Sequence, residues 1–382
     1  MSVLIACDSF KGSLSAPEVC ESIAKGIRAV CPNADVVTLP VSDGGDGLMT
    51  TLKTVLEKAG WRDVNQTVTG PYGKPVRTEF FHKGEEAIIE MAQAAGLHLS
   101  NPKERAPQLA GTFGVGELIR HAVTLGARRL FIGLGGSATN DLGLGCLQAL
   151  GVRFFDADSN ELERPFKARD LARIARLETK AFEEAFGNLK LTAVCDVTNP
   201  LLGPTGATSV FGPQKGICSD ETPEFERAMR HAADCLNAHF GFDCRNRPGA
   251  GAAGGMGAGL MWFFHAAMVS GADAVLDLIG FDQALTGADF VITGEGSFDA
   301  QSIKGKAPFG VLKRAKQSSV PVYLFAGRIA CEKSELSAMG FKGSFSLNEV
   351  EPENEKCMQN ASILLSEIGA KFAEDVLLRT PK

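Results

Sequence analysis

The 382-residue sequence lacks several features that would assign it to a common class of protein. It has no basic run and no basic helix face, and its formal net charge is −6, which argues against a nucleic-acid partner. One stretch without charged side chains, Pro248 to Ala272, resembles a membrane span. Because glycine recurs from 249 to 259 and His265 lies in the apolar half, we expect a glycine-rich loop leading into a buried helix, and no membrane partner.

The cysteines lack the spacing of a metal site. Ten of them are scattered along the chain, none forms a Cys-x-x-Cys pair, and no histidine spacing matches a zinc site. They are typical of small core residues in a reducing compartment. The apolar run Val3 to Cys7 is too short for a signal peptide, so the sequence predicts a cytoplasmic location.

Familiar nucleotide-binding signatures are also missing. No Gly-x-x-x-x-Gly-Lys-Ser/Thr occurs, since Lys306 is followed by Ala307, and no protein-kinase catalytic loop is present. Gly249-Ala-Gly-Ala-Ala-Gly254 matches the dinucleotide fingerprint. Arg245-Asn-Arg-Pro248 precedes it, and this is not a strand, so the dinucleotide interpretation is disfavoured.

The sequence does contain five acidic or polar, glycine-rich segments, each following a short apolar strand. In open α/β folds, ligands bind in a crevice at the carboxyl ends of the strands. Glycine lets backbone N–H groups approach a phosphate, and carboxylates beside such groups indicate a bridging cation, most simply Mg²⁺. The segments are Asp8-Ser-Phe-Lys-Gly-Ser13, Ser42-Asp-Gly-Gly-Asp-Gly47, Gly133-Leu-Gly-Gly-Ser-Ala-Thr-Asn-Asp141, Cys195-Asp-Val-Thr-Asn-Pro200 and Thr293-Gly-Glu-Gly-Ser-Phe-Asp299.

Strands and helices alternate at both ends of the chain, which predicts an α/β fold with a parallel sheet. The apolar run Val3 to Cys7 predicts a buried strand. Ser15-Ala-Pro-Glu18 is typical of a capping box and predicts a helix that begins there and ends near Val30. The other predicted strands are 35–41, 129–132, 189–195, 290–293 and 321–326. The other predicted helices cover 114–125, 219–240, 308–317 and 354–376. Two more helices are predicted to start near Gly44 and after Asn140.

The alternation of strands and helices is interrupted in the middle of the chain. Val64 to Thr69 and Val76 to Phe81 flank Gly70-Pro-Tyr-Gly73, which predicts a hairpin. We therefore expect a discontinuous first domain, 1–62 plus 283–382, and a second α/β domain, 63–282, inserted in it.

Two motifs supply candidate charged groups near the N-terminus. Lys11 lies just past a strand end, where it could reach a phosphate or a substrate carboxylate, and the alternative is a solvated loop lysine. Asp43 and Asp46 flank consecutive glycines. A plain N-cap would explain Asp43 alone, but two aspartates and three glycines exceed what a cap requires.

Three further motifs lie after later strands. The amides of Gly136 to Thr139 could form an anion nest, to which Ser137 and Thr139 add hydroxyl donors. Asp196 could accept a proton from a substrate hydroxyl or hold a metal, and the alternative is a turn-forming residue. The segment from Thr293 to Lys306 mixes carboxylates, glycines and a lysine, and the alternative is a charged surface loop.

Taken together, these segments closely resemble the type I glycerate kinases, in the right order and over essentially the whole chain. Ser42 and Asp46 stand where that family often has Ala and Glu, which keeps the acidic character. The resemblance rests on 8–15, 40–47, 133–141, 195–203, 249–255, 293–302 and 305–308.

The resemblance implies two α/β domains, one Rossmann-like and the other inserted in it, with the active site in the cleft between them. It implies transfer of the γ-phosphate of ATP, with Mg²⁺, to D-glycerate, on the 2-hydroxyl in the bacterial subgroup. A homo-oligomer is a candidate assembly. The alternatives are 3-hydroxyl regiochemistry, a non-catalytic nucleotide or sugar-acid sensor on the same scaffold, and a Mg²⁺-dependent phosphatase.

Phosphoryl transfer requires positioning and charge neutralisation, which assigns roles to the motif residues. Asp196 is the candidate base, while Lys11 and Lys306 would neutralise the phosphoryl group or grip the glycerate carboxylate. Asp43, Asp46 and Asp299 would hold Mg²⁺ or its water shell. The remaining candidates for nucleotide binding are Ser9, Gly12, Ser13, Gly44, Gly45, Gly135, Gly136, Ser137, Ala138, Thr139, Asn140, Asp141, Asn199, Gly294, Glu295 and Gln301.

Overall fold

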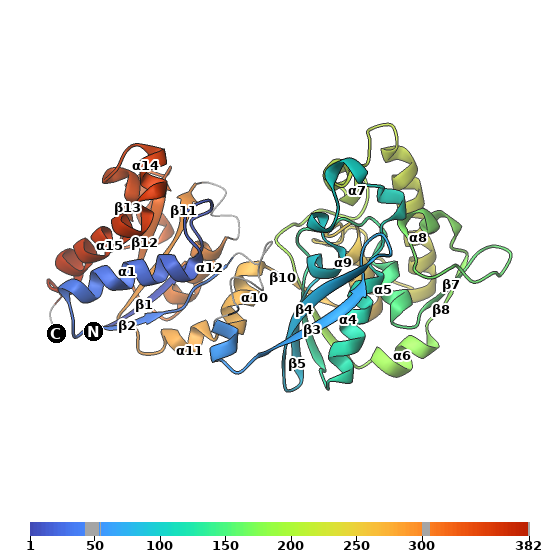
Figure 1. The fold of residues 1–382 in the computed structure, drawn as a ribbon, viewed down its shortest axis with the longest axis horizontal. Coiled ribbons are helices and arrows are strands. Elements are labelled where there is room, and N and C mark those ends of the chain that lie inside the picture. Colours follow the sequence, from blue (N-terminus) through green and yellow to red (C-terminus); the bar gives the residue numbers. More distant parts are fainter. Residues whose placement is uncertain (43–52, 54, 300–305, 381–382) are drawn as a thin grey trace. The chain divides into compact units, whose positions relative to one another are not determined.

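The computed structural model describes residues 1–42, 53, 55–299 and 306–380 (Figure 1). Its contacts divide the chain into two units, each described here by itself. Unit 1 consists of Met1–Ala59 and Ser270–Lys382, and unit 2 is Gly60–Val269. The sequence had placed the two boundaries near 62 and 283, and the second one falls earlier in the structure.

Unit 1 is built on a parallel sheet of five strands with the order β13-β12-β11-β1-β2. Every neighbouring pair in it is parallel. Numbered along the chain within this unit, the order is 2-1-3-4-5, which is a doubly wound arrangement. The strands are β1 Ser2–Cys7, β2 Asp35–Thr38, β11 Phe290–Phe298, β12 Val322–Ile329 and β13 Gly343–Ser346.

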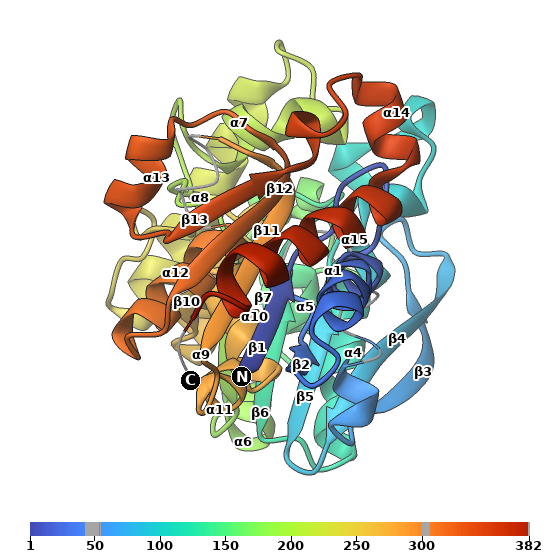
Figure 2. The same ribbon diagram turned by 90° about the vertical axis from the view of Figure 1, so that its left-hand side faces the viewer.

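Helices cover both faces of this sheet. Val3 and Ile5 of β1 pack on one face, in a core with residues of α1 and α15, whereas Leu4 and Ala6 pack on the other face with α10, α11 and α12. Figures 1 and 2 show α1 and α15 side by side, although they come from opposite ends of the sequence. The helices are α1 Ala16–Val30, α10 Gly271–Leu278, α11 Phe281–Leu285, α12 Ala307–Gln317, α13 Lys333–Met339, α14 Asn354–Gln359 and α15 Ala361–Phe372.

Unit 2 contains a mixed sheet with the order β10-β9-β6-β5-β4-β3. Its parallel part is β5, β6, β9 and β10, while β3, β4 and β5 pair antiparallel. The predicted hairpin is confirmed as β3 and β4. The strands are β3 Arg62–Thr69, β4 Pro75–Lys83, β5 Glu86–Glu90, β6 Arg129–Gly133, β9 Lys190–Val194 and β10 Ala267–Val269, with a separate pair, β7 Arg153–Phe155 and β8 Arg176–Glu178.

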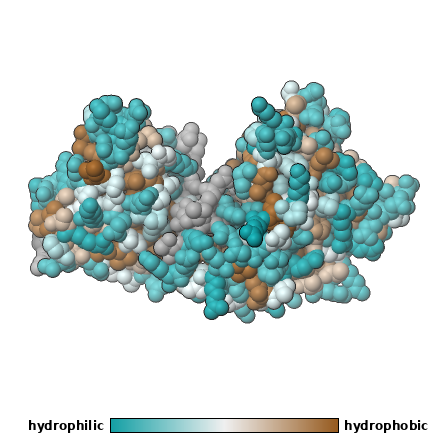
Figure 3. All heavy atoms as spheres, viewed as in Figure 1, coloured by the Kyte–Doolittle hydropathy of each residue, from teal (hydrophilic) through white to brown (hydrophobic). Residues whose placement is uncertain are grey.

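The helices of unit 2 pack around one large apolar core. The uncharged stretch that begins at Pro248 is confirmed as a turn-rich loop leading into a buried helix, α9. No helix among the described residues is long and apolar enough to cross a membrane. The helices are α3 Ala92–Ala95, α4 Phe113–Thr124, α5 Leu144–Ala149, α6 Lys180–Phe186, α7 Ala207–Lys215, α8 Thr222–Phe240 and α9 Met256–Phe264. Hydrophilic residues cover much of the face of each unit that Figure 3 shows.

Three sequence-based predictions of secondary structure were wrong in their extent. The segment from Gly294 to Phe298 was expected to be a loop, but β11 continues through it because its residues pair with β12 as far as Ile329. The last helix was expected to be continuous, but it is interrupted at Asn360. The helix expected directly after Asn140 begins only at Leu144.

Candidate functional site

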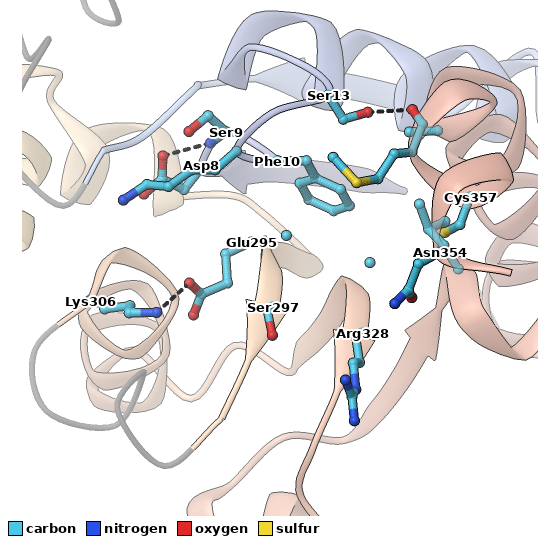
Figure 4. Close-up of a pocket in the computed structure, with 16 residues that line it drawn as sticks. Asp8, Ser9, Phe10, Ser13, Glu295, Ser297, Lys306, Arg328, Asn354 and Cys357 are labelled. Carbon is cyan, nitrogen blue, oxygen red and sulfur yellow. Dashed lines mark hydrogen bonds and ion pairs between the residues drawn. The ribbon is translucent and has the colours of Figure 1, made fainter. Parts of the chain in front are cut away.

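Unit 1 contains a pocket of about 340 Å³ at the carboxyl ends of its central strands (Figure 4). It lies where β1, β11 and β12 end, and the start of α12 and the segment from Leu347 to Ala361 complete its wall. The order of the sheet reverses beside β1, so the pocket occupies the switch point at which doubly wound folds bind ligands. Its lining is Asp8, Ser9, Phe10, Lys11, Ser13, Glu295, Gly296, Ser297, Lys306, Gly327, Arg328, Leu347, Asn354, Cys357, Met358 and Ala361.

The first wall of the pocket is the turn that follows β1. Asp8 donates its backbone N–H to the carbonyl of Gly294 at 2.8 Å, which continues the pairing of β1 with β11. Its carboxylate accepts the N–H of Ser9 at 2.6 Å. The chain then closes a tight turn through Gly12, whose φ of +80° is a left-handed value that glycine adopts without strain. This turn brings Asp8 and Lys11 to the same pocket.

The opposite wall carries an ion pair. Nζ of Lys306, at the start of α12, lies 2.9 Å from Oε2 of Glu295 on β11. Oε1 of Glu295 is buried and finds no hydrogen-bond partner among the described residues. A buried carboxylate oxygen without a partner costs on the order of 1–3 kcal/mol, so a fold selected for stability alone has no reason to keep it. The oxygen is available to a ligand or a cation in the pocket.

The remaining wall is largely apolar. Phe10, Leu347, Cys357, Met358 and Ala361 form it, and Ser13 Oγ donates to the carbonyl of Met358 at 2.6 Å. The hydrogen of the Ser13 hydroxyl is therefore already in use, so its part in binding is limited to accepting a hydrogen bond. A pocket with charged groups at one side and apolar groups at the other suits a ligand with an anionic and a hydrophobic part.

The structure brings several predicted residues together in this pocket, namely Ser9, Lys11, Ser13, Glu295 and Lys306. Gly294 has a structural reason to be glycine, because a Cβ there would lie 1.7 Å from the carbonyl oxygen of Phe325. Asp299 follows β11 and is half-buried, outside the pocket lining. The predicted residues Asp43, Gly44, Gly45, Asp46 and Gln301 lie outside the described residues.

Unit 2 carries the glycine loop that follows β6. Strands β6 and β9 are parallel neighbours, and Leu134 N donates to the carbonyl of Val194 at 3.0 Å where β6 ends. The predicted nest is not fully available, because Ala138 N donates to the carbonyl of Ala95 at 2.8 Å. Any anion at this loop must therefore rely on the other amides and on the hydroxyl of Ser137.

Asp141 supports this loop from inside the unit. Its side chain is fully buried, and its carboxylate accepts the N–H and hydroxyl of Thr112, each at 2.8 Å, as well as the amides of Gly143 and Gly145. Burial raises the pKa of Asp141, and the hydrogen bonds oppose this increase. The carboxylate joins the glycine loop to the start of α4, so its contacts describe a structural support. Its predicted contact with a nucleotide stays a prediction.

Lys215, the last residue of α7, was missed by the sequence analysis. It is 1 % exposed, and its Nζ donates to Ser137 Oγ at 2.9 Å and to the carbonyl of Thr139 at 2.7 Å. Burial lowers the pKa of Lys215 to about 7, and the negative charge of Asp141 acts in the opposite direction. No pattern in the sequence marked this lysine, which follows Gly-Pro-Gln within a helix.

Two polar atoms of the same loop are buried without hydrogen-bond partners among the described residues. They are Oγ1 of Thr139 and Oδ1 of Asn140. The amide nitrogen of Asn140 does have a partner, since it donates to Thr208 Oγ1 at 3.1 Å. Each unsatisfied atom costs on the order of 1–3 kcal/mol. As with Glu295, such atoms indicate a segment whose conformation serves more than stability.

Asp196 and Asn199 follow β9 at the same edge of this sheet. Asp196 is exposed, and Asn199 is half-buried with its side-chain amide donating to the carbonyl of Thr205 at 2.8 Å. Because β6 and β9 are parallel neighbours, the glycine loop and Asp196 leave the sheet at the same edge. Each unit thus gathers its candidate residues at the carboxyl edge of its parallel strands.

Comparison with known proteins shows the family to which the chain belongs. The model of the glycerate kinase family matches residues 3–377 of the chain. The chain belongs to the glycerate kinase family. It is therefore a phosphotransferase that acts on glycerate.

Individual relatives agree with this assignment. A glycerate kinase of Bacillus subtilis (strain 168) is 44% identical over 349 residues, which cover 91% of this chain and 90% of the relative. The glycerate 2-kinase of Escherichia coli (strain K12) is 39% identical with the same coverage. The crystal structure of a candidate glycerate kinase 2 from Salmonella typhimurium LT2 is 37% identical, covers 99% of this chain and 98% of its own, and superposes with a TM-score of 0.85.

In this glycerate kinase, close packing explains the glycines of the segment 249–255. A Cβ on Gly254 would lie 2.0 Å from the carbonyl oxygen of Thr139, and one on Gly251 would lie 2.3 Å from that of Pro200. The segment packs directly against the loops that follow β6 and β9. Its glycines permit close backbone packing, which is consistent with rejecting the dinucleotide interpretation.

Arg328 is a second residue of this kinase that sequence reasoning missed. It lies near the end of β12 and lines the unit 1 pocket (Figure 4). The predicted strand stopped at residue 326, so the rule that functional side chains follow strand ends could have identified this arginine. Arg328 thus joins Lys11 and Lys306 among the basic residues that line the pocket, and its side chain extends away from Lys306 in Figure 4.

Proposed function

We propose that the chain transfers the γ-phosphate of ATP, with Mg²⁺, to the 2-hydroxyl of D-glycerate, giving 2-phosphoglycerate and ADP. The observation that carries the ATP and Mg²⁺ part is the unit 1 pocket, where Lys11, Lys306 and Arg328 accompany Asp8 and Glu295. Cations that face a phosphate together with carboxylates that can hold a divalent cation are the parts that phosphoryl transfer requires. The 2-hydroxyl is supported by the relative named glycerate 2-kinase.

The donor atoms available in unit 1 fit Mg²⁺. This cation prefers oxygen ligands, usually one or two carboxylates together with waters and substrate phosphates. Glu295 Oε1 is a buried carboxylate oxygen without a partner among the described residues, and Asp8 is nine-tenths buried beside it in the same pocket. Together with the predicted ligands Asp43, Asp46 and Asp299, these groups would hold the cation, which supplies charge neutralisation on the phosphates.

The side chains of the kinase have separate tasks in this proposal. Lys11 and Lys306 neutralise charge on the transferred phosphoryl group or hold the glycerate carboxylate, and the loop after β6 binds phosphate through its amides and Ser137. Asp196 is the candidate base. Its exposed carboxylate can orient a hydroxyl and accept its proton, and a hydroxyl is a poor nucleophile without such help. In this proposal, residues of both units take part in a single transfer.

The location and assembly also remain proposals. All ten cysteines are free, five of them buried, which supports a reducing compartment such as the cytoplasm. A homo-oligomer stays a prediction.

Phosphorus NMR of the reaction product tests the proposal. With ATP, Mg²⁺ and D-glycerate we expect a phosphomonoester signal split into a doublet by the single proton on carbon 2. A triplet would place the phosphate on the primary carbon and establish the 3-kinase alternative. Inorganic phosphate released without glycerate would establish a phosphatase. Reactions without Mg²⁺, and with GTP in place of ATP, test the cation and the nucleotide separately.

A further inference from the structure

A buried lysine, Lys215, contacts the loop after β6 and lies outside the glycine-rich motifs of the sequence. Lys215 closes α7, and its Nζ donates to Ser137 Oγ at 2.9 Å and to the carbonyl of Thr139 at 2.7 Å. No ion pair joins it to a carboxylate among the described residues, although Asp141 influences its charge. Lysine is almost never fully buried unless it is paired, so this amine needs a reason to be there.

Packing alone does not supply that reason. A methionine would fill a similar volume without the cost of removing an amine from water, and burying an unpaired charge is expensive. What distinguishes lysine here is its two hydrogen bonds, both to the same glycine-rich loop. They fix the carbonyl of Thr139 and the hydroxyl of Ser137 relative to α7.

The contact with Ser137 has a chemical consequence. A hydroxyl carries one hydrogen and two acceptor lone pairs. Because Ser137 Oγ accepts a hydrogen from Nζ of Lys215, the hydroxyl keeps its own hydrogen for a different acceptor. A phosphate oxygen at the loop would be such an acceptor, and a charge-assisted hydrogen bond of this kind is about twice as strong as a neutral one.

We propose that Lys215 is a positioning residue of the phosphate loop, which orients the Ser137 hydroxyl as a donor to a phosphate oxygen and places positive charge behind the loop. The inference rests on the proposed assignment of this loop to phosphate. Lys215 is too deeply buried to contact a substrate itself, so it acts through Ser137 and Thr139.

The titration of Lys215 gives the proposal a second consequence. Burial lowers its pKa to about 7, and Asp141 is the acidic group that opposes this. A bound phosphate would favour the charged amine in the same way as Asp141 does, so nucleotide binding should be accompanied by proton uptake. At pH 8 the phosphates of ADP are already ionised, and any uptake there comes from the protein.

The experiment measures ADP binding by calorimetry, without turnover, for wild type, Lys215→Met, Ser137→Ala and the double variant. We expect each single substitution to weaken ADP binding about tenfold, and the double variant to be no weaker than Ser137→Ala. Lys180→Met is the matched control, since that lysine is exposed on α6 of the same unit and should bind ADP normally. The thermal midpoint of Lys215→Met should not fall.

The outcomes distinguish a failure of the role of Lys215 from a failure of the assignment of this loop to phosphate. If Ser137→Ala binds ADP normally, the phosphate assignment of the loop fails, and the inference fails with it. If Ser137→Ala weakens binding but Lys215→Met does not, or if the two effects are independent, only the role of Lys215 is overturned. If Lys215→Met does not fold, the inference is tested by measuring proton uptake with the wild-type protein. Binding of ADP at pH 8 in buffers of different ionisation enthalpy must show proton uptake, and its absence overturns the inference.

Discussion

The two units of this kinase present their candidate functional groups in different ways. In unit 1 they are side chains that line an open pocket at strand ends, such as Lys11, Lys306 and Arg328. In unit 2 most of them belong to the loop after β6, which is largely buried and held from behind by Asp141 and Lys215, while Asp196 after β9 is exposed. The first arrangement supplies charge, and the second supplies a fixed backbone conformation.

This difference predicts different responses to substitution. A charged side chain at an open pocket stays partly in contact with water, so its removal should cost less folding free energy than the loss of a fully buried acceptor. The buried Asp141 carboxylate cannot be removed in this way, since the donors of Thr112 and Gly145 would lose their acceptor. Unit 1 substitutions should therefore change mainly the kinetics, while loss of the Asp141 carboxylate behind the unit 2 loop should also lower stability.

The largest effect is expected at Lys11. We predict that Lys11→Ala lowers turnover by roughly 10²–10⁴-fold, because electrostatic stabilisation of a transferring phosphoryl group typically contributes that much. A coupled assay of ADP release measures it, and the thermal midpoint should stay at the wild-type value. Lys25→Ala is the control, because Lys25 is exposed on α1 and absent from the pocket lining. Activity of Lys11→Ala within threefold of wild type would remove this lysine from the site.

Asp141 should give the largest effect on stability. Asp141→Ala leaves the N–H and hydroxyl of Thr112 and the amide of Gly145 without their acceptor inside the core. Buried donors left unsatisfied cost about 1–3 kcal/mol each, so we expect unfolding in urea to become easier by about 3–5 kcal/mol in total. An unchanged urea midpoint would contradict the contrast drawn between the two units.

A smaller kinetic effect is expected at Glu295. Glu295→Gln keeps the shape but removes the charge that faces Lys306 Nζ at 2.9 Å and weakens a candidate magnesium ligand. We expect roughly a tenfold loss of kcat/KM, the size of one charge-assisted hydrogen bond, and a higher Mg²⁺ requirement. Titration of activity with Mg²⁺ measures both. A normal Mg²⁺ dependence would exclude Glu295 from cation binding.

The smallest effect concerns pH and Lys215. The pKa of this lysine is about 7 in the fold and near the usual 10.5 in the unfolded chain, so the unfolded chain binds more protons between these values. Stability should therefore rise with pH above about 7, by about 1 kcal/mol from pH 7 to pH 8. Urea unfolding of wild type and Lys215→Met at both pH values isolates this contribution, which the variant should lack. Equal pH dependence in the two proteins would refute the lowered pKa.

Local sequence patterns predicted much of the fold. The capping box that opens α1 is present, with Ser15 and Glu18 bonded reciprocally, and the continuous apolar run of β1 is buried on both faces as a parallel strand requires. The strand β11 was predicted too short. Glycine and serine residues from Gly294 to Ser297 suggested a loop, but their close pairing with β12 is a tertiary effect that local propensity does not report.

The candidate site was predictable to the extent that it lies at strand ends. Ser9 and Lys11 follow β1 and were named as candidates, together with Glu295 on β11 and Lys306 at the start of α12. Lys215 was not found because it comes from the end of a helix, 78 positions from Ser137, and only folding brings the two together. The hydrogen bond from Ala138 N to Ala95, which limits the anion nest, was invisible for the same reason.

The most direct test of the proposal that residues of both units act in one phosphoryl transfer is the single-turnover rate of Asp196→Asn measured beside Lys11→Ala. We predict that Asp196→Asn lowers the rate of transfer about 10²-fold or more while ATP affinity changes little, since a base acts mainly in the transition state. Weaker nucleotide binding that extra Mg²⁺ restores would instead make Asp196 a metal ligand. Transfer at the wild-type rate by Asp196→Asn, with Lys11→Ala impaired, would contradict the proposal.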